Sequence, residues 1–130
     1  MVKHSVRWQK TLRDDDILAA LDFCPLTAED MLKLSQTWNQ PFTSLRRVQE
    51  RLKQLSEAGQ LRSWRYATTG PAGTSRLYYK LSLDGYRTLH ADADALPPTK
   101  RYLNQIAPGR HRHQQMLSRF IVHTHVATHQ

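Results

Sequence analysis

The sequence predicts a mainly α-helical domain with one small β-hairpin, followed by an amphipathic C-terminal helix. Residues 43–58 have one apolar helix side, made at spacings of three and four by Leu45, Val48, Leu52 and Leu55. Residues 61–67 alternate in character and residues 77–81 are apolar and aromatic, so two strands are expected around a Gly/Pro loop at 68–75. Helical spacing returns beyond residue 110, in His113, Met116, Leu117, Phe120, Ile121 and Thr124.

Two scaffold helices are predicted before the basic one. Asp14, Asp15 and Asp16 open the first, where negative charge matches the positive end of the helix dipole. These three aspartates splay around the helix and lack partners at ligand spacing, so we assign them to the scaffold rather than to a metal. Thr27 and Asp30 form a capping-box pattern that starts the second helix.

A turn at residues 38–41 then redirects the chain into the helix at 43–58. Thr43 or Ser44 caps that helix by accepting a bond from an unpaired backbone N–H. Gly59 ends it, because glycine takes the left-handed conformation without steric cost. The side opposite the leucines is basic.

Helix, turn, basic helix and hairpin is the order of a winged helix-turn-helix domain, which we place at residues 14–91. The hairpin is followed by a short helix at 82–90, and residues 92–99 are interpreted as a linker because they contain small residues, acids and paired prolines. Residues 100–130 form a helical extension that begins with a helical turn at 100–106. Residues 1–13 are a basic arm, which either lies along DNA or frays.

The charge distribution favours a polyanionic partner. The formal net charge is +8 over 130 residues. Residues 14–30 hold six acids and no Lys or Arg, whereas residues 42–80 hold eight bases against two acids. The positive charge therefore gathers on the predicted recognition helix and wing, where a winged helix meets double-stranded DNA.

Ten residues are the candidate DNA contacts. Those near the helix start approach base edges and phosphates, with Arg46 or Arg47 as the source of base preference, because the paired donors of arginine match guanine O6 and N7. Arg51 and Lys53 contact the backbone, and the wing is anchored by its three polar residues. The candidates are Thr43, Ser44, Arg46, Arg47, Gln49, Arg51, Lys53, Arg65, Thr74 and Arg76.

Two family resemblances follow from these motifs. The segments LTAEDMLKLSQ, RRVQERLKQLSEAGQL and YYKLSLDGYRTL are similar to winged-helix regulators of the MarR and PadR sort. With RHRHQQMLSRFIVHTHVA after a linker, the order resembles the replication-relaxation family of plasmid and conjugative-element proteins, associated with plasmid DNA relaxation and mobilisation. This resemblance implies that Arg46, Arg47 and Arg51 contact DNA, and that His111 or His113 corresponds to the family's helix histidine.

The terminal histidines are not expected to form a metal or catalytic site. Two His-x-His pairs occur, but residues two apart on a helix point in nearly opposite directions and cannot chelate on one face. Metal binding by these histidines and relaxase-type nuclease activity remain alternatives to surface or dimer-interface histidines. We predict no cofactor, no metal and no enzymatic activity.

The predicted function is double-stranded DNA binding, as an accessory factor in plasmid replication, relaxation or mobilisation. A transcriptional repressor is one alternative, and a protein-interaction winged helix without DNA is another. The C-terminal helix either completes the core or pairs two copies, and a homodimer through it is preferred because DNA readers often address two half-sites. No apolar run spans a membrane, and with no secretory signal and the single Cys24 the chain is expected in the cytoplasm. Residues up to Gln130 show no clear helix stop signal, which is consistent with a fragment of a longer protein.

Overall fold

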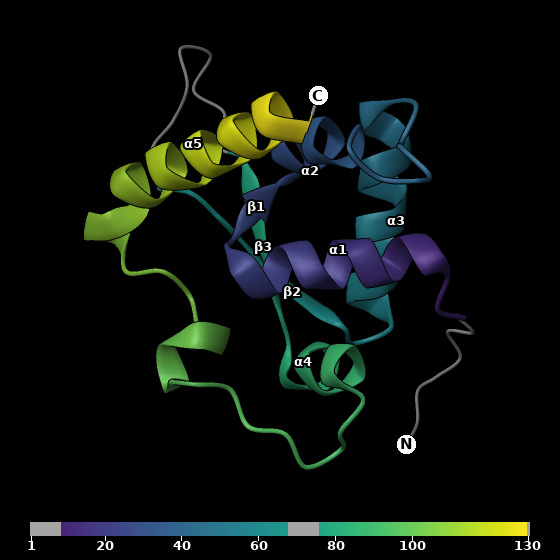
Figure 1. Ribbon diagram of the computed structural model, residues 1–130. Helices are drawn as coiled ribbons and strands as arrows, with labels where there is room; N and C mark the ends of the chain where they lie inside the picture. Colours follow the sequence, from purple (N-terminus) through teal and green to yellow (C-terminus); the bar gives the residue numbers. More distant parts are fainter. Residues whose placement is uncertain (1–8, 68–75, 130) are drawn as a thin grey trace.

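The computed structural model describes residues 9–67 and 76–129, and its helices lie around a small sheet (Figure 1). The helices are α1 (Leu12–Phe23), α2 (Ala28–Ser35), α3 (Leu45–Glu57), α4 (Leu83–His90) and α5 (His111–His129), with short 3-10 helices η1 (Lys100–Leu103) and η2 (Pro108–Arg110). The strands are β1 (Leu26–Thr27), β2 (Leu61–Arg65) and β3 (Leu77–Leu81). The mainly helical fold class is confirmed. The predicted wing loop, 68–75, and residues 1–8 of the arm lie outside the described residues.

Side-chain caps fix where the helices begin. Thr11 and Asp14 form a reciprocal capping box, so α1 starts two residues earlier than the aspartates suggested, within the predicted arm. The predicted capping box of Thr27 and Asp30 starts α2. Ser44 accepts from the Arg47 N–H at 3.3 Å, which identifies it as the cap of α3.

The hairpin belongs to a three-stranded antiparallel sheet in the order β1-β3-β2. Strands β2 and β3 pair from Leu61 opposite Leu81 to Arg65 opposite Leu77, as the hairpin prediction required. Strand β1 was not predicted, because a strand of two residues is too short to show alternation. Gly59 has φ +80°, which is the left-handed conformation expected after α3.

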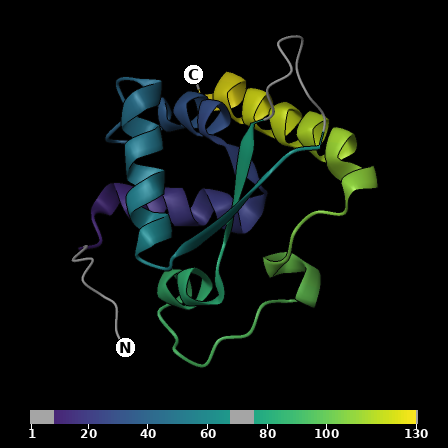
Figure 2. The ribbon, with the colours of Figure 1, turned by 180° about the vertical axis from the view of Figure 1, so that it is seen from behind.

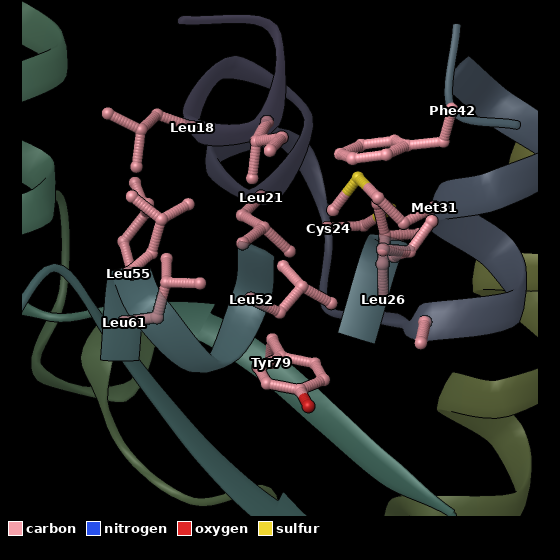
Figure 3. Packing of buried hydrophobic residues seen from close by; sticks show 14 of the residues in the cluster. Leu18, Leu21, Cys24, Leu26, Met31, Phe42, Leu52, Leu55, Leu61 and Tyr79 are labelled. Carbon is pink, nitrogen blue, oxygen red and sulfur yellow. The ribbon is translucent and has the colours of Figure 1, made fainter. Parts of the chain in front are cut away.

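The core lies between α1, α2, α3 and the sheet. Figure 3 shows Leu52 and Leu55 of α3 pointing into a cluster with side chains from α1 and from the strands. Val48, Leu52 and Leu55 are fully buried, so the predicted apolar side of α3 is confirmed. Burying such side chains stabilises the fold by about 1.5–3 kcal/mol each and fixes the opposite side of α3 toward solvent.

The C-terminal helix folds back onto α2, with a side that only partly matches the one predicted (Figure 1). The buried residues of α5 are His111, Ser118 and Val122. Met116 and Phe120, from the predicted apolar stripe, are 63% and 66% exposed. The stripe prediction is therefore wrong for Met116 and Phe120, whereas Ile121 of the stripe does pack against the core. The inner side of α5 is centred on Val122 and on Ser118, whose hydroxyl donates to the Pro25 carbonyl at 2.7 Å.

Candidate nucleic-acid interface

The solvent side of α3 carries four of the ten predicted contacts. Arg46, Arg47, Gln49 and Lys53 are all exposed, because they alternate with the buried Val48 and its neighbours around the helix. Arg46 forms an ion pair at 3.5 Å with the carboxylate of Glu50, one turn later, and the Arg46 side chain is 87% exposed. A pair this exposed holds Arg46 weakly and leaves it able to exchange partners.

The turn before α3 is fixed by the buried Phe42. Its backbone N–H donates to the Ser35 hydroxyl at 3.1 Å, and its carbonyl accepts from the Gln36 amide at 3.1 Å. The Arg13 guanidinium lies 3.9 Å from the centre of the Phe42 ring. These contacts attach the turn to α2 and α1, so the exposed Thr43 and the N-terminus of α3 have a defined position relative to the rest of the helical scaffold.

Further predicted residues lie together at the ends of the two hairpin strands that are next to the loop. Arg65 ends β2 and Arg76 precedes β3, and both line a hollow of about 290 Å³ together with Gln49 of α3. Figure 2 shows α3 beside the strands that lead into this hairpin. The hollow thus brings together predicted contacts from α3 and the hairpin that lie far apart in sequence. Thr74 lies outside the described residues.

Glu29 of α2 lies in the same hollow and was not among the sequence candidates. Its carboxylate contacts the Arg76 guanidinium at 3.3 Å, with both side chains roughly half exposed. Glu29 comes from the acidic segment of the sequence, but nothing in its spacing points to an arginine beside the second hairpin strand. The pair orients Arg76 beside the gap between α3 and the strands.

Arg51 has a structural role that the sequence did not reveal. Its Nε donates to the Asp14 carboxylate at 2.9 Å, and one terminal nitrogen donates to the Gln54 amide oxygen at 2.7 Å. The other terminal nitrogen bonds to Asp14 and, at 3.1 Å, to the Gln9 carbonyl. The side chain is only 19% exposed, so its charge joins α3 to α1 rather than facing outward with Arg46 and Arg47.

The pKa shifts of Asp14 and Arg51 show that these two side chains stabilise each other's charge. Burial by itself would raise the pKa of Asp14, but hydrogen bonds from Arg51 and Thr11 and the Arg51 charge outweigh it and hold that pKa below its usual value of 3.8. The hydrogen bond to Asp14 raises the pKa of Arg51 against the effect of burial. The signal that points to Asp14 in the sequence is its position three residues after Thr11, which is the capping-box spacing.

The histidines separate into one buried residue and an exposed group. His111 is 1% exposed, and its Nδ1 accepts from the Ala67 N–H at 2.6 Å, so Nε2 carries the proton that reaches the Ile106 carbonyl at 2.8 Å. His113, His123, His125 and His129 are exposed. The sequence predicted surface or dimer-interface histidines, and for His111, which is buried within the chain itself, that prediction is wrong. Its two ring nitrogens are both used where α5 meets the hairpin.

Residues 9–67 and 76–129 contain neither a cluster of metal ligands nor a helix that could span a membrane. No group of three His, Cys, Asp or Glu side chains there is arranged to hold a metal ion. None of the described helices combines the length and the apolar character needed to cross a membrane.

Two packed helices, a basic helix and a paired hairpin define the winged helix-turn-helix fold. Comparison with solved structures agrees: the structure resembles Bacillus subtilis PadR, determined in complex with operator DNA, with a TM-score of 0.51 and 18% sequence identity. The similarity covers 88% of this chain and 60% of the PadR chain, so this chain spans about three fifths of that protein. No protein-family model and no curated protein matches the sequence.

Proposed function

We propose that this chain is a non-enzymatic, double-stranded DNA-binding transcription regulator of the PadR type. In this proposal α3 enters the major groove and the hairpin reaches the adjacent backbone or minor groove. Arg46, Arg47 and Gln49 approach base edges and phosphates, as do Thr43 and Ser44 at the helix start. Backbone and wing contacts come from Lys53, Arg65, Thr74 and Arg76. Arg51 is left out of this set because Asp14 and Gln54 occupy its guanidinium.

The observation that carries the proposal is the two-sidedness of α3. Val48, Leu52 and Leu55 anchor one side at 0% exposure, while the other side presents Arg46 and Arg47 to solvent. A helix held this rigidly presents arginines in a fixed orientation, which is what bidentate contact with guanine requires.

The regulatory role is preferred to a plasmid role on the basis of the comparisons. The accessory role in plasmid replication, relaxation or mobilisation would use the same surface, but the PadR structure that resembles this chain is not that of a plasmid replication or mobilisation protein. The similar PadR structure contains operator DNA. A winged helix that binds protein in place of DNA is the alternative that the experiment below separates.

We further propose a homodimer through α5. Met116 and Phe120 are exposed beside a hollow of about 630 Å³ that α5 forms with α2. The same hollow is lined by Asp30 and by Lys33 and Arg119, which carry the opposite charge. A surface with apolar side chains and both signs of charge can match itself across a two-fold axis, as an isologous dimer requires.

Sedimentation velocity tests the dimer with Phe120→Lys and, as a control, Phe23→Lys, because Phe23 is a similarly exposed aromatic on α1. The wild type and Phe23→Lys should sediment as dimers, and Phe120→Lys as a monomer. A monomeric wild type, or loss of the dimer in the control alone, contradicts the proposed interface.

Fluorescence anisotropy on a labelled duplex of random sequence, at several salt concentrations, tests DNA binding. Each lost phosphate contact should lower the slope of log affinity against log salt by about 1. Arg47→Gln should therefore weaken binding and flatten the slope, and Arg46→Ala with Arg47→Ala should do so further. The matched control is Arg101→Gln, which removes one exposed positive charge from η1.

Two results would contradict this function. If Arg101→Gln weakens binding as much as Arg47→Gln, then net charge rather than α3 attracts the DNA. If the wild type does not bind at low salt, the protein-interaction alternative replaces the proposal.

A further inference from the structure

A second basic hollow lies on the opposite side of the sheet from α3. Tyr79 and Leu81 belong to the core that contains α3, and Lys80 lies between them on β3, so it projects from the other face of the sheet. There it lines a hollow of about 520 Å³ formed by β3, the connection of residues 101–110 and the start of α5. Figure 1 shows this connection on the far side of the sheet from α3.

The described residues that line this hollow include basic side chains but no acidic ones. Four basic side chains line it, namely Lys80, Arg101, Arg110 and His113. None of the described residues that line it carries a carboxylate. Lys80 is half-buried, whereas Arg101, Arg110 and His113 are exposed around it. A charge that is partly withdrawn from water is normally paired, so Lys80 and the exposed arginines beside it are suited to a ligand that brings negative charge.

Lys80 is the central group of the hollow. It is half-buried, and its ammonium donates to the carbonyls of Arg101 at 2.9 Å and Asn104 at 2.7 Å. An ammonium has three N–H donors, so one remains for a ligand. Burial, together with the nearby charge of Arg62, lowers the pKa of Lys80, and an anion in the hollow would oppose both effects.

The connection that bounds the hollow is held in place from several directions. The Ile106 N–H donates to the Tyr78 hydroxyl at 2.9 Å, and Arg62 donates to the Leu103 carbonyl at 3.2 Å. Lys80 also bonds to this connection, so the carbonyls and basic side chains that line the hollow have defined positions. Ile106 and Leu117 add an apolar patch, and Gln105 and Gln114 add amides.

We propose that this hollow binds a small phosphate-bearing metabolite. Lys80, Arg101 and Arg110 hold the phosphate, while Ile106 and Leu117 pack against the organic part. A phosphate monoester carries up to two negative charges and three acceptor oxygens, which suits several converging cations better than a single carboxylate does. The volume is within the usual range for small-molecule sites.

A duplex is a poorer occupant than a small molecule. The recognition helix and the hollow lie on opposite faces of the sheet, so a DNA double helix docked on α3 does not reach Lys80. The ligand would instead connect β3 to the start of α5. His111, next to Arg110, already bonds there to Ala67 at the base of the hairpin.

Isothermal titration calorimetry in chloride buffer, without DNA, tests the site with ribose 5-phosphate as the probe. Saturable binding is expected for the wild type. Lys80→Gln should weaken it by about tenfold or more, which is the loss expected when a hydrogen bond to a charged group is removed. Arg101→Gln should weaken it severalfold, and Arg47→Gln, which removes the same charge from α3, should bind like the wild type.

Circular dichroism establishes that each variant is folded, and because Arg101 is exposed its variant keeps the test valid if Lys80→Gln unfolds. Equal weakening in Arg47→Gln and Arg101→Gln, or no saturation at millimolar ligand, would overturn the site. Succinate binding as tightly as ribose 5-phosphate would overturn the choice of phosphate, and inorganic phosphate binding equally tightly would overturn the metabolite. Since no DNA is present, these outcomes are independent of the proposed DNA binding.

Discussion

Arg51 and Lys80 are both cationic side chains drawn partly out of water, but the protein surrounds them differently. Arg51 lies on the inner edge of α3 against the fully buried carboxylate of Asp14. Lys80 has only the carbonyls of Arg101 and Asn104 as hydrogen-bond partners among the described residues. The charge of Arg51 is neutralised within the fold and therefore contributes to stability. The charge of Lys80 has no countercharge among the described residues, which suits the proposed anionic ligand.

Removing Asp14 should have the largest effect, because it leaves Arg51 poorly exposed and without its countercharge. For Asp14→Ala we expect a loss of about 3–5 kcal/mol in the free energy of unfolding. Arg51→Met should also destabilise, and the double variant should cost less than the sum of the two. Urea unfolding followed by circular dichroism measures these values. Additive effects, or single losses below about 1 kcal/mol, would contradict a coupled pair.

The same pair predicts how stability depends on acid. The pKa of Asp14 is lowered on folding, so the stabilisation from its ionised form is complete above the unfolded value of 3.8 and is lost as pH falls through the folded value. The urea midpoint of the wild type should therefore decline below about pH 4. Asp14→Asn should start from a lower midpoint and decline less steeply. Parallel curves for the two proteins would show that Asp14 does not contribute this dependence.

Local patterns in the sequence predicted the local structure well. The spacing of Val48, Leu52 and Leu55 identified the buried side of α3, and the Thr27 and Asp30 pattern identified the start of α2. These features depend on residues within one or two helical turns. Most of the winged helix could therefore be predicted from the sequence, including the hairpin that pairs β2 with β3.

Long-range contacts could not be predicted in the same way. Arg51 looks like its neighbours Arg46 and Arg47 on a helical projection, and only its partner 37 residues away distinguishes it. On α5, hydrophobicity favoured Met116 and Phe120, which are exposed, whereas the side that packs inward also carries the polar Ser118 and His111 with hydrogen-bond partners far away in sequence. Lys80 was not predicted as a site residue, because the side chains that surround it come from residues 101–110 and from α5, far away in sequence.

His111 offers an intermediate case, a buried polar group that is satisfied by backbone rather than by a countercharge. His111→Phe keeps an aromatic side chain but removes the hydrogen bonds to Ala67 and Ile106. We therefore expect a loss of about 2 kcal/mol in the free energy of unfolding. His113→Phe, two residues later and exposed, is the matched control and should change stability by less than about 0.5 kcal/mol. Urea unfolding of both variants measures the difference, and equal effects would contradict a structural role for His111.

The smallest effect is expected at Lys80, and its size decides what the comparison with Arg51 means. In Lys80→Met the apolar part of the side chain is kept, the penalty for a half-buried charge disappears, and the carbonyls of Arg101 and Asn104 can bond to water because those contacts are exposed. The free energy of unfolding should change by less than about 1 kcal/mol, against several for Asp14→Ala. Urea unfolding in chloride buffer measures both. A loss at Lys80 as large as that at Asp14 would mean that the fold itself requires this cation, and the argument that it is kept for an anionic ligand would lose its basis.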